Sequence, residues 1–453
     1  MAIEGGDEPI IRVDLRQPQT ARDPASPGPS SLRRRPRPLP LQIRRRIRRR
    51  RLLTTPGPVP APASPSSSFE LPVLYFSLLS LGVAVSPSTA PEISRQVRLV
   101  KPAVAFAVIL LDSPEFAAMT RDGGNSLPVA DVPQSLPAAV LYSSGITGRV
   151  KGVELTHRNL IAMLTVYGGI KGAVTSPAVH LVTVPLFHAY GFGVWLCAVA
   201  KGDTLVLMSR FDMGKALSAV ERFKVTQFPA APPVVSALAR DSTVELYDLT
   251  SLELVTSSGA PLPTDAMRRF VSRFPHVLLS QGLGMTENPL AICMAVEPEE
   301  CQRLGPVGRL SSNHEAKIVD PDSGEALPPG RRGELWIRSP AVMKGYIGDQ
   351  AATAKALGKD GWLRTGDLCY FDDEGFLFVV DRLKELIKYK GYQVAPAELE
   401  DLLLTHREIV DAAVIQYFNF FLFPSLQLPT SPPDLSLALS LSLSLSKIIA
   451  NNS

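Results

Sequence analysis

The chain has 453 residues, more than one compact core usually holds, so two or three domains are expected. Hydrophobic residues make up 45% and charged residues 20% of the chain, which excludes a wholly disordered or collagen-like protein. The formal net charge of +4 depends on eleven arginines between Arg33 and Arg51, without which the 43 acidic residues outnumber the basic ones. The charge therefore gives no reason to expect a nucleic-acid partner.

Residues 1–67 are rich in arginine, proline and serine and contain the run RRRPRPLPLQIRRRIRRRRLL. A segment of this composition cannot bury enough apolar surface to offset the entropy of ordering the chain, which predicts a disordered arm. A nuclear or organelle address is the alternative, although the acids ahead of the run do not fit a transit peptide. Leu71–Val85 is the most apolar stretch, but it is shorter than a membrane span of roughly 20 residues and is expected to form a buried helix.

Residues 68–416 alternate between strand and helix patterns, which predicts parallel sheets covered by helices. Thr156 and Asp212 precede runs with helical apolar spacing and are expected to cap those helices. The other elements expected along the chain are strands at Val140–Tyr142, Leu252–Thr256 and Val277–Ser280, a helix around Thr264–Phe274, and a β-hairpin formed by Glu315–Asp320 and Gly333–Arg338.

After Ile415 the sequence keeps no helical or strand period, and it then alternates leucine and serine in LSLALSLSLSLS. Strict alternation is typical of a half-buried strand, but translation of a dinucleotide repeat produces the same pattern. A low-complexity tail over residues 417–453 is the preferred interpretation.

The segment Tyr142–Gly152, YSSGITGRVKG, follows an expected strand and carries the strongest chemical signal. Its glycines let the backbone approach a phosphate chain closely, its hydroxyl and N–H groups are donors, and Lys151 adds a positive charge. The Walker A pattern is not satisfied in this window. We therefore expect an anion-binding loop, with an ordinary flexible turn as the alternative.

Two further segments carry polar groups that suit a nucleotide. Gln281–Glu287, QGLGMTE, is expected to be a loop directly after a strand; it offers a hydroxyl for a phosphate and a carboxylate for Mg²⁺, and its last residue breaks the dinucleotide-binding fingerprint. Gly361–Asp367, GWLRTGD, ends in an aspartate that can accept ribose hydroxyls, and Asp381–Gly391 contains three lysines. For Gln281–Glu287 the alternative is a glycine turn that carries a surface acid. For the segments with the aspartate and the lysines the alternative is a solvated basic face.

Several other functions find no support in the sequence. His188 is flanked by apolar residues and is therefore expected to be a core residue. No second His or Cys lies at metal spacing, which argues against a zinc site. The absence of a G-x-S-x-G elbow argues against an α/β-hydrolase. The four cysteines lie far apart without a C-x-x-C pair, which argues against a disulfide scaffold or a zinc module and suits a reducing compartment.

Five motifs in one order resemble those of the adenylate-forming ligases: SSGITGRVKG, QGLGMTE, GELWIRSP, GWLRTGD and DRLKELIKYKGYQVAPAELE. This superfamily contains acyl-CoA synthetases, luciferase-like enzymes and plant 4-coumarate–CoA ligases, and KYKGYQVAPAELE is close to the last group and its ligase-like relatives. The resemblance implies an α/β fold in which a large N-terminal domain of parallel-rich sheets is covered by helices and is followed by a small, truncated α+β C-terminal domain. The expected parts are an AMP-binding domain at 68–380, incomplete at its start, and a hinge with a partial C-terminal domain at 381–416.

The same resemblance implies an ATP-dependent acid–CoA ligase. Such an enzyme forms an acyl-adenylate from a carboxylate and then the thioester of coenzyme A, with Mg²⁺ as the metal. A 4-coumarate-like hydroxycinnamate is the expected carboxylate, and a fatty acid or a jasmonate precursor is the alternative. A nucleotide-binding remnant with little catalytic activity is a further alternative. Neither a nucleic-acid partner nor a membrane span is expected.

The resemblance also assigns residues to each ligand. Those expected to bind ATP or AMP are Ser143, Ser144, Gly145, Ile146, Thr147, Gly148, Lys151, Gln281, Gly282, Thr286, Asp367 and Arg382. Those expected to act elsewhere are Glu287 on Mg²⁺, Tyr190, Gly259 and Met294 around the acyl group, Lys384 and Lys388 in catalysis, and Arg210, Lys390 and Gly391 on coenzyme A.

The chain departs from the family pattern at several points. Ile146 and Leu283 replace a usual threonine and a common tyrosine. The late lysine that assists adenylation has no counterpart, since Lys447 lies in the leucine–serine tail, and slow adenylation is therefore expected. The last residues are Asn-Asn-Ser in place of the peroxisomal signal of many relatives, so a cytoplasmic location is expected.

Overall fold

The computed structural model describes residues 11–14, 132–143, 150–168, 177–208, 211–389 and 392–404, together with positions 409, 412 and 414. The helix expected at 71–85 and the tail expected at 417–453 lie outside these residues, as does the expected arm 1–67 except for 11–14. The chain divides into two units, 1–414 and 415–453, and the structure below is that of the first.

The largest sheet has eight strands in the order β1-β5-β4-β6-β7-β8-β9-β10. Strands β5, β4, β6, β7 and β8 run parallel, whereas β1, β9 and β10 are antiparallel additions, so the predicted parallel sheet is confirmed. The strands are β1 Ile11–Asp14, β4 Val179–Val182, β5 Thr204–Leu207, β6 Gln227–Ala230, β7 Leu254–Ser257, β8 Leu278–Met285, β9 Asn288–Met294 and β10 Arg309–Leu310.

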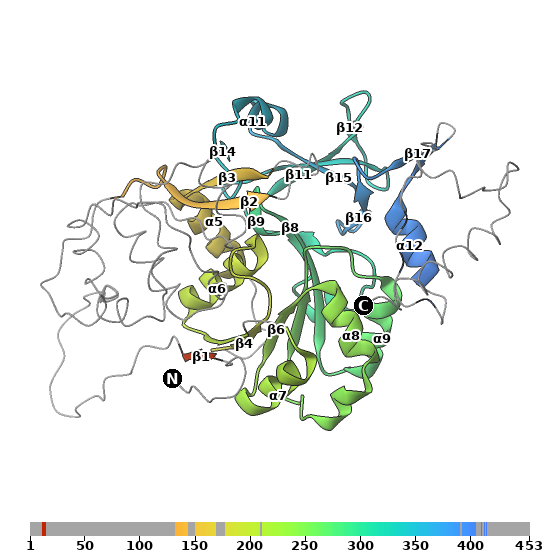
Figure 1. The fold of residues 1–453 in the computed structure, drawn as a ribbon. Helices are drawn as coiled ribbons and strands as arrows, with labels where there is room; N and C mark the ends of the chain where they lie inside the picture. Colours follow the sequence, from red (N-terminus) through yellow and green to blue (C-terminus); the bar gives the residue numbers. More distant parts are fainter. Residues whose placement is uncertain are drawn as a thin grey trace, which may run out of the picture. The chain divides into compact units, whose positions relative to one another are not determined.

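Helices cover both faces of this sheet (Figure 1). Side chains of β5 alternate between two cores: Leu205 and Leu207 pack with residues of α5 and α6, and Val206 packs with residues of α7, α8 and α9. Every position of β4, β5, β6 and β7 is buried, as expected for parallel strands covered on both faces. The helices are α5 His157–Gly168, α6 Ala189–Lys201, α7 Met213–Phe223, α8 Pro232–Arg240 and α9 Thr264–Arg273.

Two of these helices begin at the predicted caps. The Thr156 hydroxyl accepts the backbone N–H of Asn159 at 3.2 Å, and the Asn159 side chain accepts the backbone N–H of Thr156 at 2.8 Å. The Asp212 carboxylate accepts the N–H of Lys215 at 2.8 Å. Both side chains supply partners for donors that the first helical turn leaves free, which explains why α5 and α7 begin where they do.

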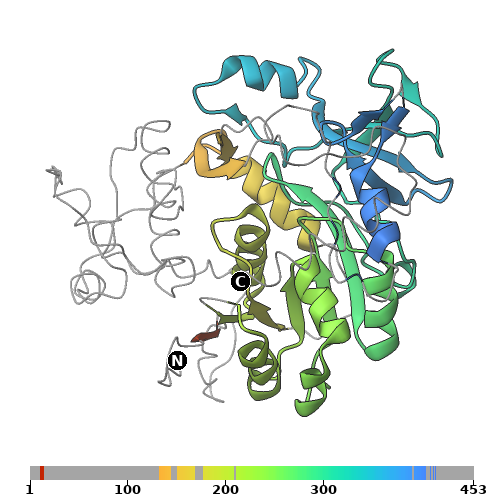
Figure 2. The same ribbon diagram turned by 45° about the vertical axis from the view of Figure 1, so that its right-hand side comes forward.

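Two smaller sheets lie beside the large one. The predicted hairpin forms the centre of a five-stranded sheet, β12-β11-β13-β15-β16, and a three-stranded sheet has the order β14-β3-β2. A β17–β18 pair and α12 follow, and α12 lies against β16 and α9 (Figure 2). No helix in the described part of the chain is long and apolar enough to cross a membrane.

The bounds of these elements are β2 Pro137–Ser143, β3 Lys151–Thr156, β11 Glu315–Val319, β12 Ala326–Leu327, β13 Gly333–Arg338, β14 Gly345–Tyr346, β15 Leu363–Phe371, β16 Leu377–Arg382, β17 Ile387–Tyr389 and β18 Tyr392–Val394. The remaining helices are the 3₁₀ helix η2 Ser242–Leu246, α10 Pro298–Cys301, α11 Gln350–Ala356 and α12 Pro396–Leu404.

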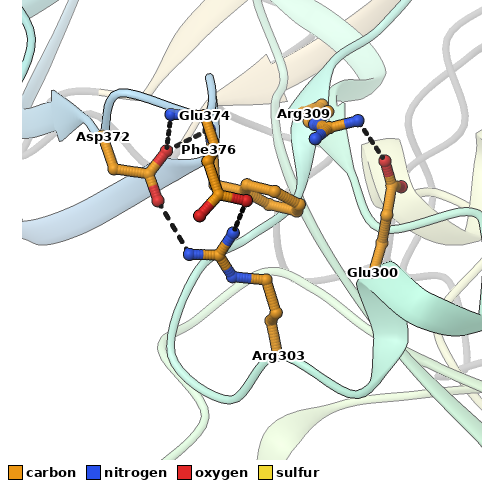
Figure 3. A network of polar contacts seen from close by, with 6 residues as sticks. All are labelled: Glu300, Arg303, Arg309, Asp372, Glu374 and Phe376. Carbon is orange, nitrogen blue, oxygen red and sulfur yellow. Dashed lines mark hydrogen bonds and ion pairs between the residues drawn. The ribbon is translucent and has the colours of Figure 1, made fainter.

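A polar cluster joins the segment after α10 to the turn between β15 and β16 (Figure 3). The guanidinium of Arg303 pairs with Asp372 at 3.1 Å and with Glu374 at 2.6 Å. The same group lies 4.2 Å from the ring centroid of Phe376, and Arg309 lies 4.5 Å from that ring. Arg303, in the segment after α10, and Arg309, in β10, therefore both hold the buried ring that precedes β16.

Replacing Arg303 by methionine is expected to lower the free energy of unfolding by about 1–2 kcal/mol, because it removes two partly exposed ion pairs and one cation–π contact, each worth at most about 1 kcal/mol. Urea unfolding monitored by tryptophan fluorescence measures the change. The exposed Arg331 provides a control, since Arg331→Met is expected to stay within about 0.5 kcal/mol of the parent. Equal effects of the two substitutions would contradict the role given to Arg303.

Candidate active site

A cavity of about 530 Å³ opens where the large sheet meets the two smaller sheets. It lies outside the carboxyl ends of β7 and β8, the place where open parallel sheets usually bind their ligands. Motifs far apart in the sequence meet there: the two described ends of the Tyr142–Gly152 segment, the Gln281–Glu287 segment and the GWLRTGD segment. The predicted site residues that line the cavity are Ser143, Lys151, Tyr190, Gly259, Gly282, Thr286, Glu287, Met294, Arg382 and Lys384.

Asp367 and Gln281 are described and buried but are not among the residues that line the cavity, and the remaining predicted residues cannot be placed. The phosphate loop is described only at its two ends, Ser143 and Lys151. Lys388 belongs to β17, but its side chain is not among those described. The predicted site residues outside the described part are Ser144, Gly145, Ile146, Thr147, Gly148, Arg210, Lys390 and Gly391.

The segment predicted as a loop at Gln281–Glu287 is instead mostly strand. β8 runs through Met285 and pairs with β9, so that only the last two residues form the turn. Successive side chains in a strand point to opposite faces, and Gly282 and Gly284 line the cavity. The Gln281 side chain accordingly points the other way and donates to the carbonyl of Pro306 at 3.4 Å. Gln281 itself does not line the cavity, and a contact between this residue and the adenylate stays a prediction.

Glu287, Tyr346 and Lys151 form one cluster at the cavity wall. The Tyr346 hydroxyl donates to Glu287 Oε1 at 2.8 Å, and the Lys151 ammonium lies 4.6 Å from the centroid of the Tyr346 ring. Burial and the negative charge of Glu287 raise the pKa of Tyr346, so the phenol remains a neutral donor. The tyrosine thus fixes a nearly buried carboxylate next to a lysine.

Asp367 and Arg382 form a second cluster, on neighbouring positions of β15 and β16. Arg382 Nε donates to Asp367 Oδ1 at 2.7 Å, while Oδ2 of the same carboxylate is buried and has no hydrogen-bond partner. Burial raises the pKa of Asp367 to about 6 even though Arg382 opposes this shift. A buried, unsatisfied acceptor is costly, so this oxygen marks a position where a ligand donor is expected.

The predicted acyl-binding residues line another part of the same cavity. The Tyr190 hydroxyl donates to the carbonyl of Thr256 at 2.9 Å, and burial raises the pKa of this tyrosine. Gly259 has a φ of +94°, and no atom lies within 4 Å of the position that a Cβ would take. Leu290 and Met294 add apolar surface. Together they form a wall that is apolar except for the anchored hydroxyl.

His188 was expected to be a core residue, and that expectation is wrong. Its side chain is exposed, lines the cavity, and accepts the N–H of Tyr190 at 3.3 Å as the N-cap of α6. Partial desolvation lowers the pKa of His188 and favours the neutral acceptor. The sequence signal that could have predicted this cap is the position of His188 directly before the apolar run of α6. Three more charged residues line the cavity: Glu334 and Arg364 lie in the motifs GELWIRSP and GWLRTGD without an assigned role, and Lys355 lies in no motif.

Comparison with known proteins agrees with this site. Residues 67–347 match the AMP-binding enzyme family. The chain is 46% identical over 376 residues to 4-coumarate–CoA ligase-like 9 of Arabidopsis thaliana, which covers 78% of this chain and 67% of that relative. It is 39% identical over 384 residues to peroxisomal OPC-8:0-CoA ligase 1 of the same plant, which covers 78% of this chain and 70% of that relative. The chain thus spans about two thirds of the length of these relatives.

The solved structure of o-succinylbenzoate–CoA synthetase from Bacillus subtilis, in complex with ATP and magnesium ion, is also similar. It has a TM-score of 0.65 and 26% sequence identity, and the match covers 76% of this chain and 74% of that chain. The predicted fold class is confirmed by this likeness. The chain belongs to the AMP-binding enzymes of the adenylate-forming superfamily, in the group of the plant 4-coumarate–CoA ligase-like proteins.

Proposed function

We propose that this chain activates a carboxylic acid with ATP and transfers the acyl group to coenzyme A. In the first step a carboxylate oxygen attacks the α-phosphorus of ATP, and pyrophosphate leaves with the bonding electron pair. In the second step the coenzyme A thiolate attacks the acyl carbonyl carbon, and AMP leaves. The observation that carries the proposal is the buried, unpaired Oδ2 of Asp367. Gly366, which precedes Asp367, and Arg382, the ion-pair partner of Asp367, both line the cavity, which ten residues predicted for this chemistry line in all.

The ribose of the nucleotide is assigned to Asp367 and Arg382. A ribose hydroxyl is a neutral donor, and the unpaired carboxylate oxygen is the acceptor that it requires. Arg382, which lines the cavity, keeps the other carboxylate oxygen occupied and orients the group. Binding of the nucleotide would thereby satisfy an acceptor that the ligand-free chain leaves without a partner.

The phosphates are assigned to the side of the cavity that holds Lys151 and Glu287. Among the described residues no group of three His, Cys, Asp or Glu side chains could hold a metal ion alone. Mg²⁺ is commonly held by one or two carboxylates together with substrate phosphates, and the oriented Glu287 fits that donor set. When bound, Mg²⁺ would neutralise negative charge on the phosphates. Lys151 supplies a fixed positive charge on the same wall.

The carboxylate substrate is assigned to the wall formed by Tyr190, Gly259 and Met294. An apolar wall with one hydroxyl suits a hydroxycinnamate such as 4-coumarate, and it also accommodates the chain of a fatty acid. The likeness to an OPC-8:0-CoA ligase supports the second substrate class as the alternative. Lys384, which lines the cavity, is assigned to the adenylate, and Lys388, Arg210, Lys390 and Gly391 keep their assigned roles as part of the proposal.

The cytoplasm is the proposed location. All four cysteines are free and buried, as suits a reducing compartment. The peroxisome of the OPC-8:0-CoA ligase relative is the alternative.

Purified protein incubated with ATP, Mg²⁺, coenzyme A and one carboxylate at a time tests the proposal. The expected products are pyrophosphate, AMP and the acyl-CoA thioester, each dependent on the carboxylate. Comparing 4-coumarate with OPC-8:0 and a medium-chain fatty acid distinguishes the substrate classes. Release of ADP in place of AMP would contradict the proposal, as would failure of calorimetry to detect any binding of ATP.

A further inference from the structure

The side chain of Glu334 connects three positions of the five-stranded sheet beside the ribose site. It projects from β13, is half-buried and lines the cavity. Its Oε2 accepts the indole N–H of Trp336 at 2.8 Å, and its Oε1 accepts the backbone N–H of Gly366 at 3.1 Å. Both carboxylate oxygens therefore accept a donor from the protein itself.

Gly366 lies in an irregular part of the β13–β15 ladder. The register shifts there, so that three residues of β15, Thr365–Asp367, lie opposite Leu335 alone. Gly366 has a φ of +75°, in the left-handed region that side chains other than glycine rarely adopt. Such a bulge removes an N–H from regular pairing, and Glu334 is the acceptor that this N–H finds.

The bulge presents the carboxylate that the ribose needs. Asp367 directly follows Gly366, so the Glu334–Gly366 hydrogen bond fixes the backbone immediately before it. We propose that Glu334 is a positioning residue, which holds the bulge in the geometry that directs the free oxygen of Asp367 to the ribose hydroxyls. This inference rests on the proposed function, since it assumes that the cavity binds a nucleotide.

Trp336 strengthens the argument because its own position is fixed. The Arg364 guanidinium lies 4.7 Å from the Trp336 ring centroid, and the Lys317 ammonium lies 4.9 Å from it. Two cations from neighbouring strands thus hold the indole that donates to Glu334. A carboxylate held between a fixed indole N–H and a backbone N–H has little rotational freedom. Glu334 is therefore a rigid support for the bulge.

Glu334→Gln tests this role with little change of shape. The two N–H groups bond to different oxygens of Glu334, and in glutamine one of these positions is an NH₂ donor, so one of the two hydrogen bonds is lost. Calorimetry measures the affinity for ATP and for 2′,3′-dideoxy-ATP, which lacks both ribose hydroxyls. The parent is expected to bind ATP more tightly than the dideoxy nucleotide. In the variant the ratio of these two affinities is expected to fall about fivefold, while the affinity for the dideoxy nucleotide stays unchanged.

Two further variants make the test specific. Trp336→Phe keeps an aromatic ring but removes the indole donor, and a smaller loss of the same preference is expected. Glu315→Gln, on the same sheet, removes an exposed partner of Arg338 and is expected to change neither affinity. If Glu334→Gln is unfolded in thermal scans, Trp336→Phe decides the question.

The outcomes separate this inference from the proposed function. A parent protein that binds ATP and its dideoxy analogue equally well would overturn the ribose site itself. A parent that prefers ATP, with a folded Glu334→Gln variant that keeps the whole preference, would overturn only the role of Glu334. Equal losses for both nucleotides would indicate a general structural effect and would also overturn it.

Discussion

Asp367→Asn is expected to weaken ATP binding about 100-fold and at the same time to stabilise the ligand-free protein at neutral pH. Asparagine keeps the shape of the side chain but loses charge-assisted acceptance of the ribose hydroxyls, and hydrogen bonds to charged groups are worth about 1.5–3 kcal/mol each. Most of the loss should disappear with 2′,3′-dideoxy-ATP. Calorimetry with the two nucleotides measures both affinities.

The gain in stability follows from the raised pKa of Asp367. The folded chain holds the Asp367 proton up to about pH 6, whereas an unfolded aspartate releases it near its ordinary value of 3.8. The native state therefore binds more protons between these two pH values, and this group's contribution to the free energy of unfolding falls as the pH rises through that window. Removing the charge should raise the free energy of unfolding above pH 6 by about 1–3 kcal/mol, measured by urea unfolding.

The same titration predicts how binding depends on pH. The deprotonated Asp367 is the better acceptor, so the affinity of the parent for ATP should increase from pH 5 to pH 7, and the asparagine variant should lack that increase. Asp373→Asn serves as a control, because this exposed residue lies just beyond β15. An asparagine variant that binds ATP as tightly as the parent would exclude the ribose contact.

The helix starts could be predicted from the sequence because each depends on residues only a few positions apart. Thr156 and Asp212 cap helices through their own side chains within three residues, so the sequence contains all of the information needed. Of the five parallel strands, only β7 and β8 were predicted by residue range, and buried polar residues such as His180 in β4 and Gln227 in β6 interrupt the apolar pattern of the others. The pairing of Asp367 with Arg382 was implied only by resemblance, since it depends on β15 and β16 lying side by side.

Glycine misled the prediction for β8. The glycines of Gln281–Glu287 predict a loop, but Gly284 lies within β8. A Cβ at Gly284 would come within 2.3 Å of the carbonyl oxygen of Leu290, so the glycine permits close approach of β9. Glycine in a strand often marks such an approach or a bulge. A sequence alone does not distinguish this requirement from a turn.

The contacts of Glu334 and His188 depend on tertiary structure, which the sequence around each residue does not reveal. Glu334 belongs to a motif that was recognised, yet its partner Gly366 lies 32 positions later in the chain. His188 was assigned to the core because its neighbours are apolar, but those neighbours are buried while the cap position faces the cavity. The neighbours in sequence therefore did not determine the environment of either side chain.

Lys151→Met is expected to weaken ATP binding roughly 10- to 150-fold while changing AMP binding less than about threefold. The range corresponds to the loss of one hydrogen bond between charged groups, about 1.5–3 kcal/mol. The two nucleotides respond differently because only ATP carries the β- and γ-phosphates, which the proposed site places near Lys151 and Glu287. Methionine keeps most of the side-chain length and its packing on the Tyr346 ring, so the substitution removes mainly the charge.

Lys344→Met is the matched control for this variant. Lys344 lies next to β14, and its ammonium pairs at 2.7 Å with Glu154 of β3, the strand that also contains Lys151. Neither residue of this pair lines the cavity. Losing that exposed pair should change the free energy of unfolding by less than about 1 kcal/mol and leave ATP affinity unchanged. Equal losses of ATP and AMP in Lys151→Met would show that the ammonium does not act on the terminal phosphates. In that case the charge acts either on the α-phosphate or through Tyr346 on Glu287. Tyr346→Phe should reproduce the loss only in the second case.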